Sequence, residues 1–131
     1  MRVGFAAAAL AVLASVQTAQ AAEQRMRFWN LTHTTVDELY LAPAGTDKWG
    51  PNQCLNDDDK SVDVDERLML KDIEPGRYDV KIGDEHGRRC LVRNVEVKSG
   101  GKYAFSIDER FIVTTMEARN RKMVAQRDTA T

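Results

Sequence analysis

The chain has 131 residues, of which 43% are hydrophobic, and its formal net charge is −1 at pH 7. This length suits one domain and leaves little room for a second. A charge so close to zero argues against nucleic acid as a partner, because nucleic-acid-binding proteins usually present a strongly basic face.

The first 21 residues have the pattern of an export signal. A short basic start at Met1 and Arg2 precedes an apolar run over residues 3–16, and the small residues Ala19 and Ala21 follow. This pattern is typical of a cleaved signal peptide, and its apolar run is too short to remain as a membrane span. No later run approaches the ~20 apolar residues that a spanning helix needs. We therefore expect a periplasmic or secreted mature protein without a transmembrane segment.

The mature chain predicts an all-β fold. Apolar and polar residues alternate in short segments, which is the pattern of strands with one buried face. Between Val92 and Val95 the apolar face shifts by one residue, which predicts a β-bulge near Arg93 and Asn94. The expected strands cover residues 25–32, 35–42, 67–71, 78–82, 90–97, 103–107 and 110–116. They predict a small antiparallel β-sandwich of about seven strands within residues 22–116.

Short links between these strands predict two hairpins, at residues 33–34 and at residues 99–102. Residues 117–131 are polar and basic, and Met123 and Val124 are their one apolar pair. We expect these residues to form a flexible tail, with a short docking helix as the alternative.

Residues 44–65 are rich in Gly, Pro, Asn and Asp and lack apolar periodicity, so we expect a long loop. Trp49 lies in it beside Gly50 and Pro51. An aromatic side chain in such a loop could anchor a partner or a sugar. It could equally plug the open end of the sandwich.

The chain contains two cysteines, Cys54 and Cys90. In an exported chain, a pair without metal-binding spacing favours one disulfide. This bond would close a loop of about 37 residues and contribute roughly 3–4 kcal/mol. We therefore expect a Cys54–Cys90 disulfide.

Residues 57–66 carry six carboxylates against one cation, Lys60. Alternate positions supply oxygen ligands, as in loops that bind hard cations, although no EF-hand pattern is present. A calcium site is therefore one interpretation and a solvated acidic loop is the other. The candidate metal ligands are Asp57, Asp59, Asp63 and Asp65.

A group of three basic residues, Arg88, Arg89 and Arg93, lies close to Cys90 in the sequence. We expect this group to face the acidic residues 57–66 of the same chain, brought there by the disulfide. Arg88 and Arg89 are also candidate binding residues, together with Trp49.

Two resemblances follow from these segments. Residues 70–80 (LKDIEPGRYDV) resemble the L-x-P-G-x-Y-x-V pattern of transthyretin-like and collagen-binding-type B repeat domains, which implies a small β-sandwich and no particular activity. The mature chain is also similar to small exported bacterial β-sandwich proteins of uncharacterised function. The matching residues are Phe28, Asn30, Thr32, Leu39, Tyr40, Pro43, Gly45, Trp49 and Gly50. This second resemblance implies the fold and an exported location.

The serines Ser61, Ser99 and Ser106 lie outside any nucleophile-elbow pattern, so we do not expect an enzyme. We expect a non-enzymatic, monomeric exported protein without a cofactor. Its binding or structural role would be exerted through residues 44–65 on an unidentified protein or envelope partner. The alternative function is divalent-cation (Ca²⁺) binding by the acidic residues 57–66.

Overall fold

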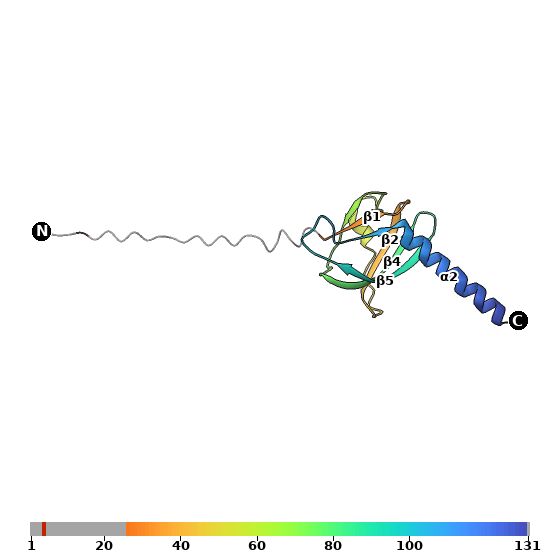
Figure 1. Ribbon diagram of the computed structural model, residues 1–131. Helices are drawn as coiled ribbons and strands as arrows, with labels where there is room; N and C mark the ends of the chain where they lie inside the picture. Colours follow the sequence, from red (N-terminus) through yellow and green to blue (C-terminus); the bar gives the residue numbers. More distant parts are fainter. Residues whose placement is uncertain (1–3, 5–25, 131) are drawn as a thin grey trace.

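The computed structural model describes residue 4 and residues 26–130, so the predicted export signal lies outside the described residues except for Gly4. The elements are β1 (Arg27–Leu31), β2 (Val36–Pro43), the 3-10 helix η1 (Gln53–Asn56), β3 (Arg67–Met69), β4 (Gly76–Asp84), β5 (Arg89–Val97), β6 (Phe105–Asp108) and α2 (Glu109–Thr129). The fold is therefore mostly β with one C-terminal helix (Figure 1). None of the described helices is long and apolar enough to span a membrane.

The strands form two small sheets, with orders β3-β1-β6 and β2-β4-β5. The second sheet is antiparallel throughout, whereas β1 pairs antiparallel with β3 and parallel with β6. The prediction of a purely antiparallel arrangement of about seven strands was therefore wrong. Side chains from both sheets contribute to one buried core, including Phe28, Leu39, Val80, Ile82 and Ile107.

Neither predicted hairpin forms. The link after β1 carries the chain from one sheet to the other, and so does the link between β5 and β6. We call the link after β1 the first crossing. There, hydrogen bonds of the fully buried Asn30 amide take the place of strand pairing. Its Nδ2 donates to the carbonyls of Thr34 (2.9 Å), Val62 (2.9 Å) and Asp63 (3.2 Å). Its Oδ1 accepts from the backbone N–H and the hydroxyl of Thr32.

The predicted β-bulge is confirmed. Tyr78 and Val80 of β4 pair with Val95 and Val92 of β5, so Arg93 and Asn94 together lie opposite one residue, Asp79. Asn94 adopts a positive φ of 56°, and its N–H donates to Asp79 Oδ1 at 3.0 Å. The bulge therefore keeps the apolar side chains before and after it on the same face of the sheet.

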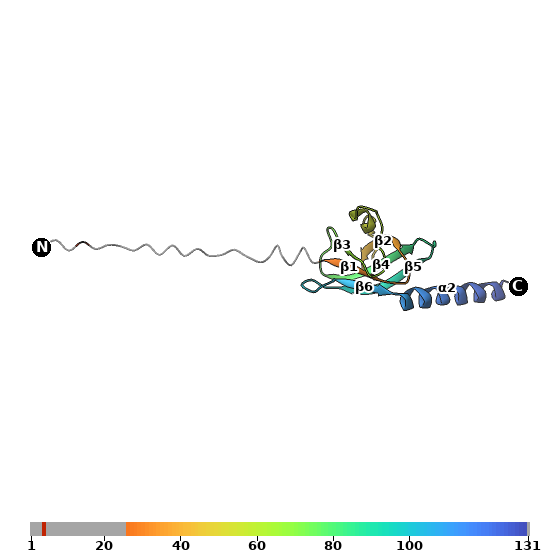
Figure 2. The same cartoon turned by 90° about the horizontal axis from the view of Figure 1, so that it is seen from above.

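The strand expected at residues 110–116 and the flexible tail expected after it are replaced by α2. The side chain of Asp108 caps this helix by accepting from the N–H of Arg110, and Glu109 supplies an acidic residue in the first turn. Both features favour a helix N-terminus. Ile112 is buried and Met116, four residues later, packs on the core, as helical spacing requires. Beyond these residues α2 extends away from the sheets (Figure 2).

The expected Cys54–Cys90 disulfide is absent, since both cysteines are free thiols buried at separate places. Cys54 Sγ lies 3.7 Å from the carbonyl of Val36, and Cys90 Sγ lies 3.7 Å from that of Ile112. Burial, with smaller effects from nearby carboxylates, raises the pKa of Cys54 to about 12. Such thiols behave as small apolar side chains.

Amide side chains hold the long loop in place of the disulfide. Asn52 Oδ1 accepts from the N–H of Leu39 at 3.0 Å, and its Nδ2 donates to the carbonyl of Asp37 at 3.0 Å. Gln53, which is buried, exchanges two hydrogen bonds with the backbone of Lys71. The two Asn52 hydrogen bonds also satisfy backbone groups at the outer edge of β2 that would otherwise be unpaired.

Adding a reductant is therefore expected to change the unfolding free energy by less than about 0.5 kcal/mol, because no disulfide constrains the unfolded chain. Alkylation should modify both thiols after denaturation without reductant and neither thiol in the folded protein. A loss of roughly 3–4 kcal/mol in the unfolding free energy on reduction would instead show that the disulfide is present.

Candidate binding site

The outer face of the β2-β4-β5 sheet gathers the side chains that bear most directly on binding. Register places Tyr40 of β2 beside Lys81 of β4, and Lys81 beside Leu91 of β5. The neighbours of Lys81 along β4, Val80 and Ile82, are buried in the core. Because side chains alternate along a strand, Tyr40, Lys81 and Leu91 face outward as one row.

A groove of about 370 Å³ lies between this outer face and the first turns of α2. We call it the sheet groove. Its lining comes from three strands and the helix: Glu38, Tyr40, Lys81, Ile82, Arg89, Cys90, Leu91, Thr115 and Arg119. Small-molecule sites commonly have this size and combine apolar walls with a few polar groups.

Trp49 lies on the same outer face. The N–H of Gly50 donates to the carbonyl of Leu41 at 3.0 Å, which holds this part of the loop against β2. The Nζ of Lys81 lies 4.2 Å from the centroid of the Trp49 ring, within the range of a cation–π contact. Trp49 is half-buried and outside the core cluster. It therefore extends the outer face rather than plugging the core.

The charges around the sheet groove are unevenly balanced. Arg89 forms two hydrogen bonds with Glu38, Nε–Oε2 at 2.9 Å and Nη2–Oε1 at 3.0 Å. Glu38 reaches Arg89 across Gly83, where an added Cβ would lie 2.7 Å from Glu38 Oε2. Lys81 and Arg119 have no ion-pair partner among the described residues. The groove thus combines an apolar floor with two cations for which the described residues supply no ion pair, one of them resting over the Trp49 ring.

Arg88 belongs to a different site. Its Nε donates to Asp84 Oδ2 at 2.6 Å, its Nη1 donates to Glu109, and its Nη2 donates to Thr34 Oγ1 at 3.1 Å. The side chain of Arg88 is 23% exposed and that of Asp84 is 1% exposed. This network joins the first crossing, the β4–β5 turn and the start of α2. Arg88 is therefore a structural residue.

The network shifts the pKa of both carboxylates. Burial alone would raise the pKa of Asp84, but hydrogen bonds from Thr34 and Arg88 outweigh it, so its pKa is lowered. For Glu109, hydrogen bonds from Arg88 and from the N–H of His33 lower the pKa. Both groups are therefore held in the charged form in which they accept hydrogen bonds.

The expected contact between the basic group and the acidic residues 57–66 does not form. Arg88 pairs with Asp84 and Glu109, Arg89 with Glu38, and Arg93 with Asp79 at 3.4 Å. Each arginine therefore has an acceptor on the sheets or on α2. Without the disulfide, nothing brings the acidic loop to them.

The candidate metal ligands point to different partners. Asp57 and Asp59 accept from the backbone of Asp58 and Ser61, whereas Asp63 accepts from Thr35 and Asp65 from the indole N–H of Trp29. Within the part of the chain that the structure describes, no three acidic, His or Cys side chains are placed to hold a metal ion.

Crowding in this acidic segment affects Glu66. A hydrogen bond from the N–H of Asp63 favours its charged form, but burial and the carboxylates of Asp57 and Asp63 outweigh that bond. The pKa of Glu66 is consequently raised.

A second hollow, of about 590 Å³, lies beside the turn before β4 and borders Met26. Its polar groups include Asp72 and Glu74, and the Tyr78 hydroxyl is already bonded to the carbonyl of Glu74 at 2.8 Å. Unlike the sheet groove, it has no cation in its lining.

No family model, curated protein or solved structure matches the chain. Function must therefore be argued from the site. Of the sequence-predicted binding residues, the structure brings Trp49 and Arg89 to the outer face and places Arg88 elsewhere. Tyr40, Lys81 and Leu91 were missed, although the alternation around Leu39 and Leu41 could have indicated an outward Tyr40.

Proposed function

We propose that this is a non-enzymatic binding protein that holds a small amphipathic anion in the sheet groove. The apolar part of the ligand would lie on Tyr40 and Leu91. Its negative group would be placed between Lys81 and Arg119. Trp49, from the predicted binding loop, would close one side.

The observation that carries this proposal is the pair of cations at an apolar groove. A half-solvated sheet normally presents polar side chains outward, yet here Tyr40, Trp49 and Leu91 gather on the outer face. An apolar floor favours a ligand with apolar surface. Lys81 and Arg119 favour a ligand that also carries negative charge.

We further propose that the protein is exported, as the pattern of residues 1–21 suggests, and that its two sheets are a variant of a β-sandwich. A periplasmic or secreted location would expose it to amphipathic anions of the cell envelope. The calcium alternative is not carried forward, because its four candidate ligands have separate partners.

Fluorescence titration with anilinonaphthalene sulfonate, an aromatic anion, tests the proposal. We expect saturable binding that decanoate displaces. Arg119→Ala and Tyr40→Ala should each weaken it about tenfold, as expected for the loss of one charge-assisted or one aromatic contact. Arg121→Ala and Tyr103→Ala are matched controls, with an exposed arginine two residues further along α2, on another side of the helix, and an exposed tyrosine outside the groove.

Thermal melts establish that each variant is folded, since this probe also binds loosely packed states. Equal affinity of the native protein and the Arg119→Ala and Tyr40→Ala variants would refute the proposal. So would the absence of saturable binding by the native protein.

A further inference from the structure

Among the described residues, the distal half of α2 has no buried side chain. Every residue of α2 after Met116 is exposed, and the helix projects away from the two sheets (Figures 1 and 2). Isolated helices shorter than about 12–15 residues are only marginally stable in water. A surface that covers this part of α2 would therefore stabilise it.

One face of this distal half combines cations with apolar side chains. Arg127 follows Val124 by three residues and Met123 by four, so these three share a face, and Arg121, three residues before Val124, lies at its edge. Met123 is 47% exposed and Val124 is 56% exposed. Among the described residues, neither Arg121 nor Arg127 has an ion-pair partner.

Residues 55–66 present the complementary chemistry. Six carboxylates stand against Lys60, and none of the six forms an ion pair within the described chain. Two apolar side chains accompany them, Leu55 at 59% exposed and Val64 at 51% exposed. An arriving cation would relieve the crowding that is evident at Glu66.

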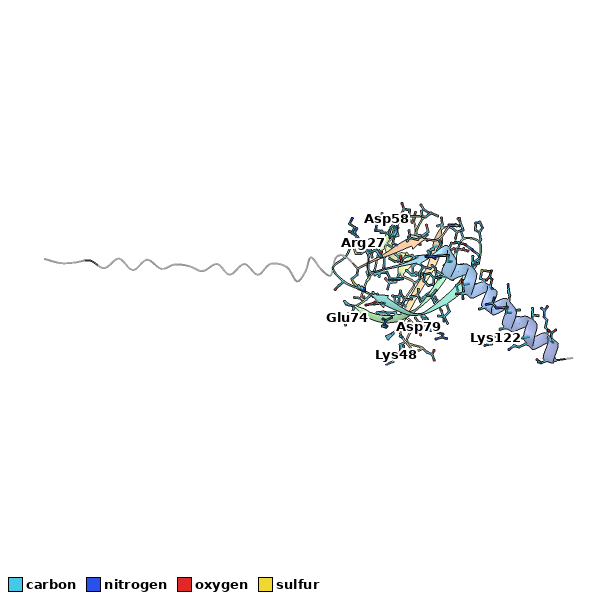
Figure 3. The ribbon with its side chains drawn as sticks, viewed as in Figure 1. Arg27, Lys48, Asp58, Glu74, Asp79 and Lys122 are labelled. Carbon is cyan, nitrogen blue, oxygen red and sulfur yellow. The ribbon has the colours of Figure 1, made fainter. Side chains whose placement is uncertain are left out.

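We propose that the distal half of α2 docks on residues 55–66 of a second copy of this chain. The two surfaces do not meet within one molecule, since Asp58 lies on the body formed by the sheets and Lys122 on the helix that projects from it (Figure 3). The contact is therefore head-to-tail and joins two different surfaces. Such contacts close reciprocally in a two-fold dimer or continue into larger rings or open chains. The protein then self-associates, in place of the monomer that the sequence suggested.

Sedimentation velocity over a range of protein concentration tests this proposal. We expect the weight-average mass to rise with concentration at low ionic strength. It should return to the monomer value near 1 M salt, where the screening length falls to about 3 Å. A constant monomer mass at every concentration would overturn the proposal.

Two charge-reversal variants identify the surfaces. Arg121→Glu/Arg127→Glu and Asp58→Lys/Asp59→Lys, all at exposed positions, should each remain monomeric. When the two variants are mixed, the native helix of the second can still bind the native residues 55–66 of the first. A dimer containing one copy of each should therefore form, with no larger species. Lys48→Glu/Lys102→Glu is the matched control and should self-associate like the native protein.

Self-association of the Arg121→Glu/Arg127→Glu variant would overturn the proposal, as would a mixture of the two variants that stays monomeric. Binding of α2 to vesicles of anionic lipid, with the protein monomeric in solution, would assign the helix to a membrane surface instead. Melting temperatures near the native value confirm that the variants are folded.

Discussion

Asn30→Ala is expected to lower the unfolding free energy by about 4 kcal/mol, because each buried polar group left without a partner costs about 1–3 kcal/mol. The amide of Asn30 is fully buried and serves five backbone or hydroxyl groups at the crossing between the sheets. Alanine supplies none of these five hydrogen bonds, and a water molecule in the space it leaves would replace only about two to four of them. A loss of this size is a large fraction of the 5–15 kcal/mol typical of a domain.

Urea unfolding measures this effect. Asn120→Ala removes the same side chain at an exposed position of α2 and should change the unfolding free energy by less than about 0.5 kcal/mol. An Asn30→Ala variant as stable as the Asn120→Ala variant would show that the crossing does not depend on this amide.

Arg88→Leu is expected to cost about 3 kcal/mol, because it leaves the buried Asp84 and the half-buried Glu109 without their cation. The loss of stability should affect mainly the start of α2, since Arg88 connects Glu109 to the β4–β5 turn. Arg88 is therefore a positioning residue for the helix wall of the sheet groove. Probe affinity should fall in this variant although Arg88 does not line the groove.

The matched control is Arg89→Leu, at the neighbouring position. Its ion pair with Glu38 is more exposed, and exposed pairs contribute about 0–1 kcal/mol. A loss of stability as large in Arg89→Leu as in Arg88→Leu would contradict this account.

The pH dependence of the Arg88 effect follows from the lowered pKa values of Asp84 and Glu109. A carboxyl whose pKa is lower in the folded state stabilises the protein above its unfolded pKa, about 4. This contribution is lost as the pH falls through the lower, folded value. The difference in stability between the native protein and Arg88→Leu should therefore be full at neutral pH and shrink below about pH 4. A difference independent of pH would mean that the side chain acts through packing alone.

Local sequence patterns predicted local structure well. Alternation placed β1, β2, β4, β5 and β6 and also the bulge at Arg93 and Asn94, because each of these depends on neighbouring residues. The sheet to which a strand belongs depends on distant partners. The short links at residues 33–34 and 99–102 therefore suggested hairpins where the chain changes sheets.

The helical part of residues 110–116 and the separate burial of the two thiols were missed for different reasons. Residues 110–116 contain Phe, Ile, Val and two Thr, whose preference favours a strand, whereas the cap at Asp108 and the packing of Ile112 favour α2. For the cysteines, a count of two in a chain expected to be exported cannot show that each thiol is buried at its own place.

The candidate site was only partly predictable for the same reason. Trp49 and Arg89 could be selected by residue type, but the sheet groove needs the register of three strands and the path of α2. Arg119 in particular was assigned to a flexible tail, where it could not form part of a site.

An amide chemical-shift titration with decanoate tests the proposed binding site most directly. We predict that the largest shifts cluster at Glu38–Tyr40, Lys81, Arg89–Leu91 and Thr115–Arg119, the residues around the sheet groove. Shifts centred on Met26, Leu70 and Tyr78, in the second hollow, would contradict the assignment. So would a spectrum that decanoate leaves unchanged.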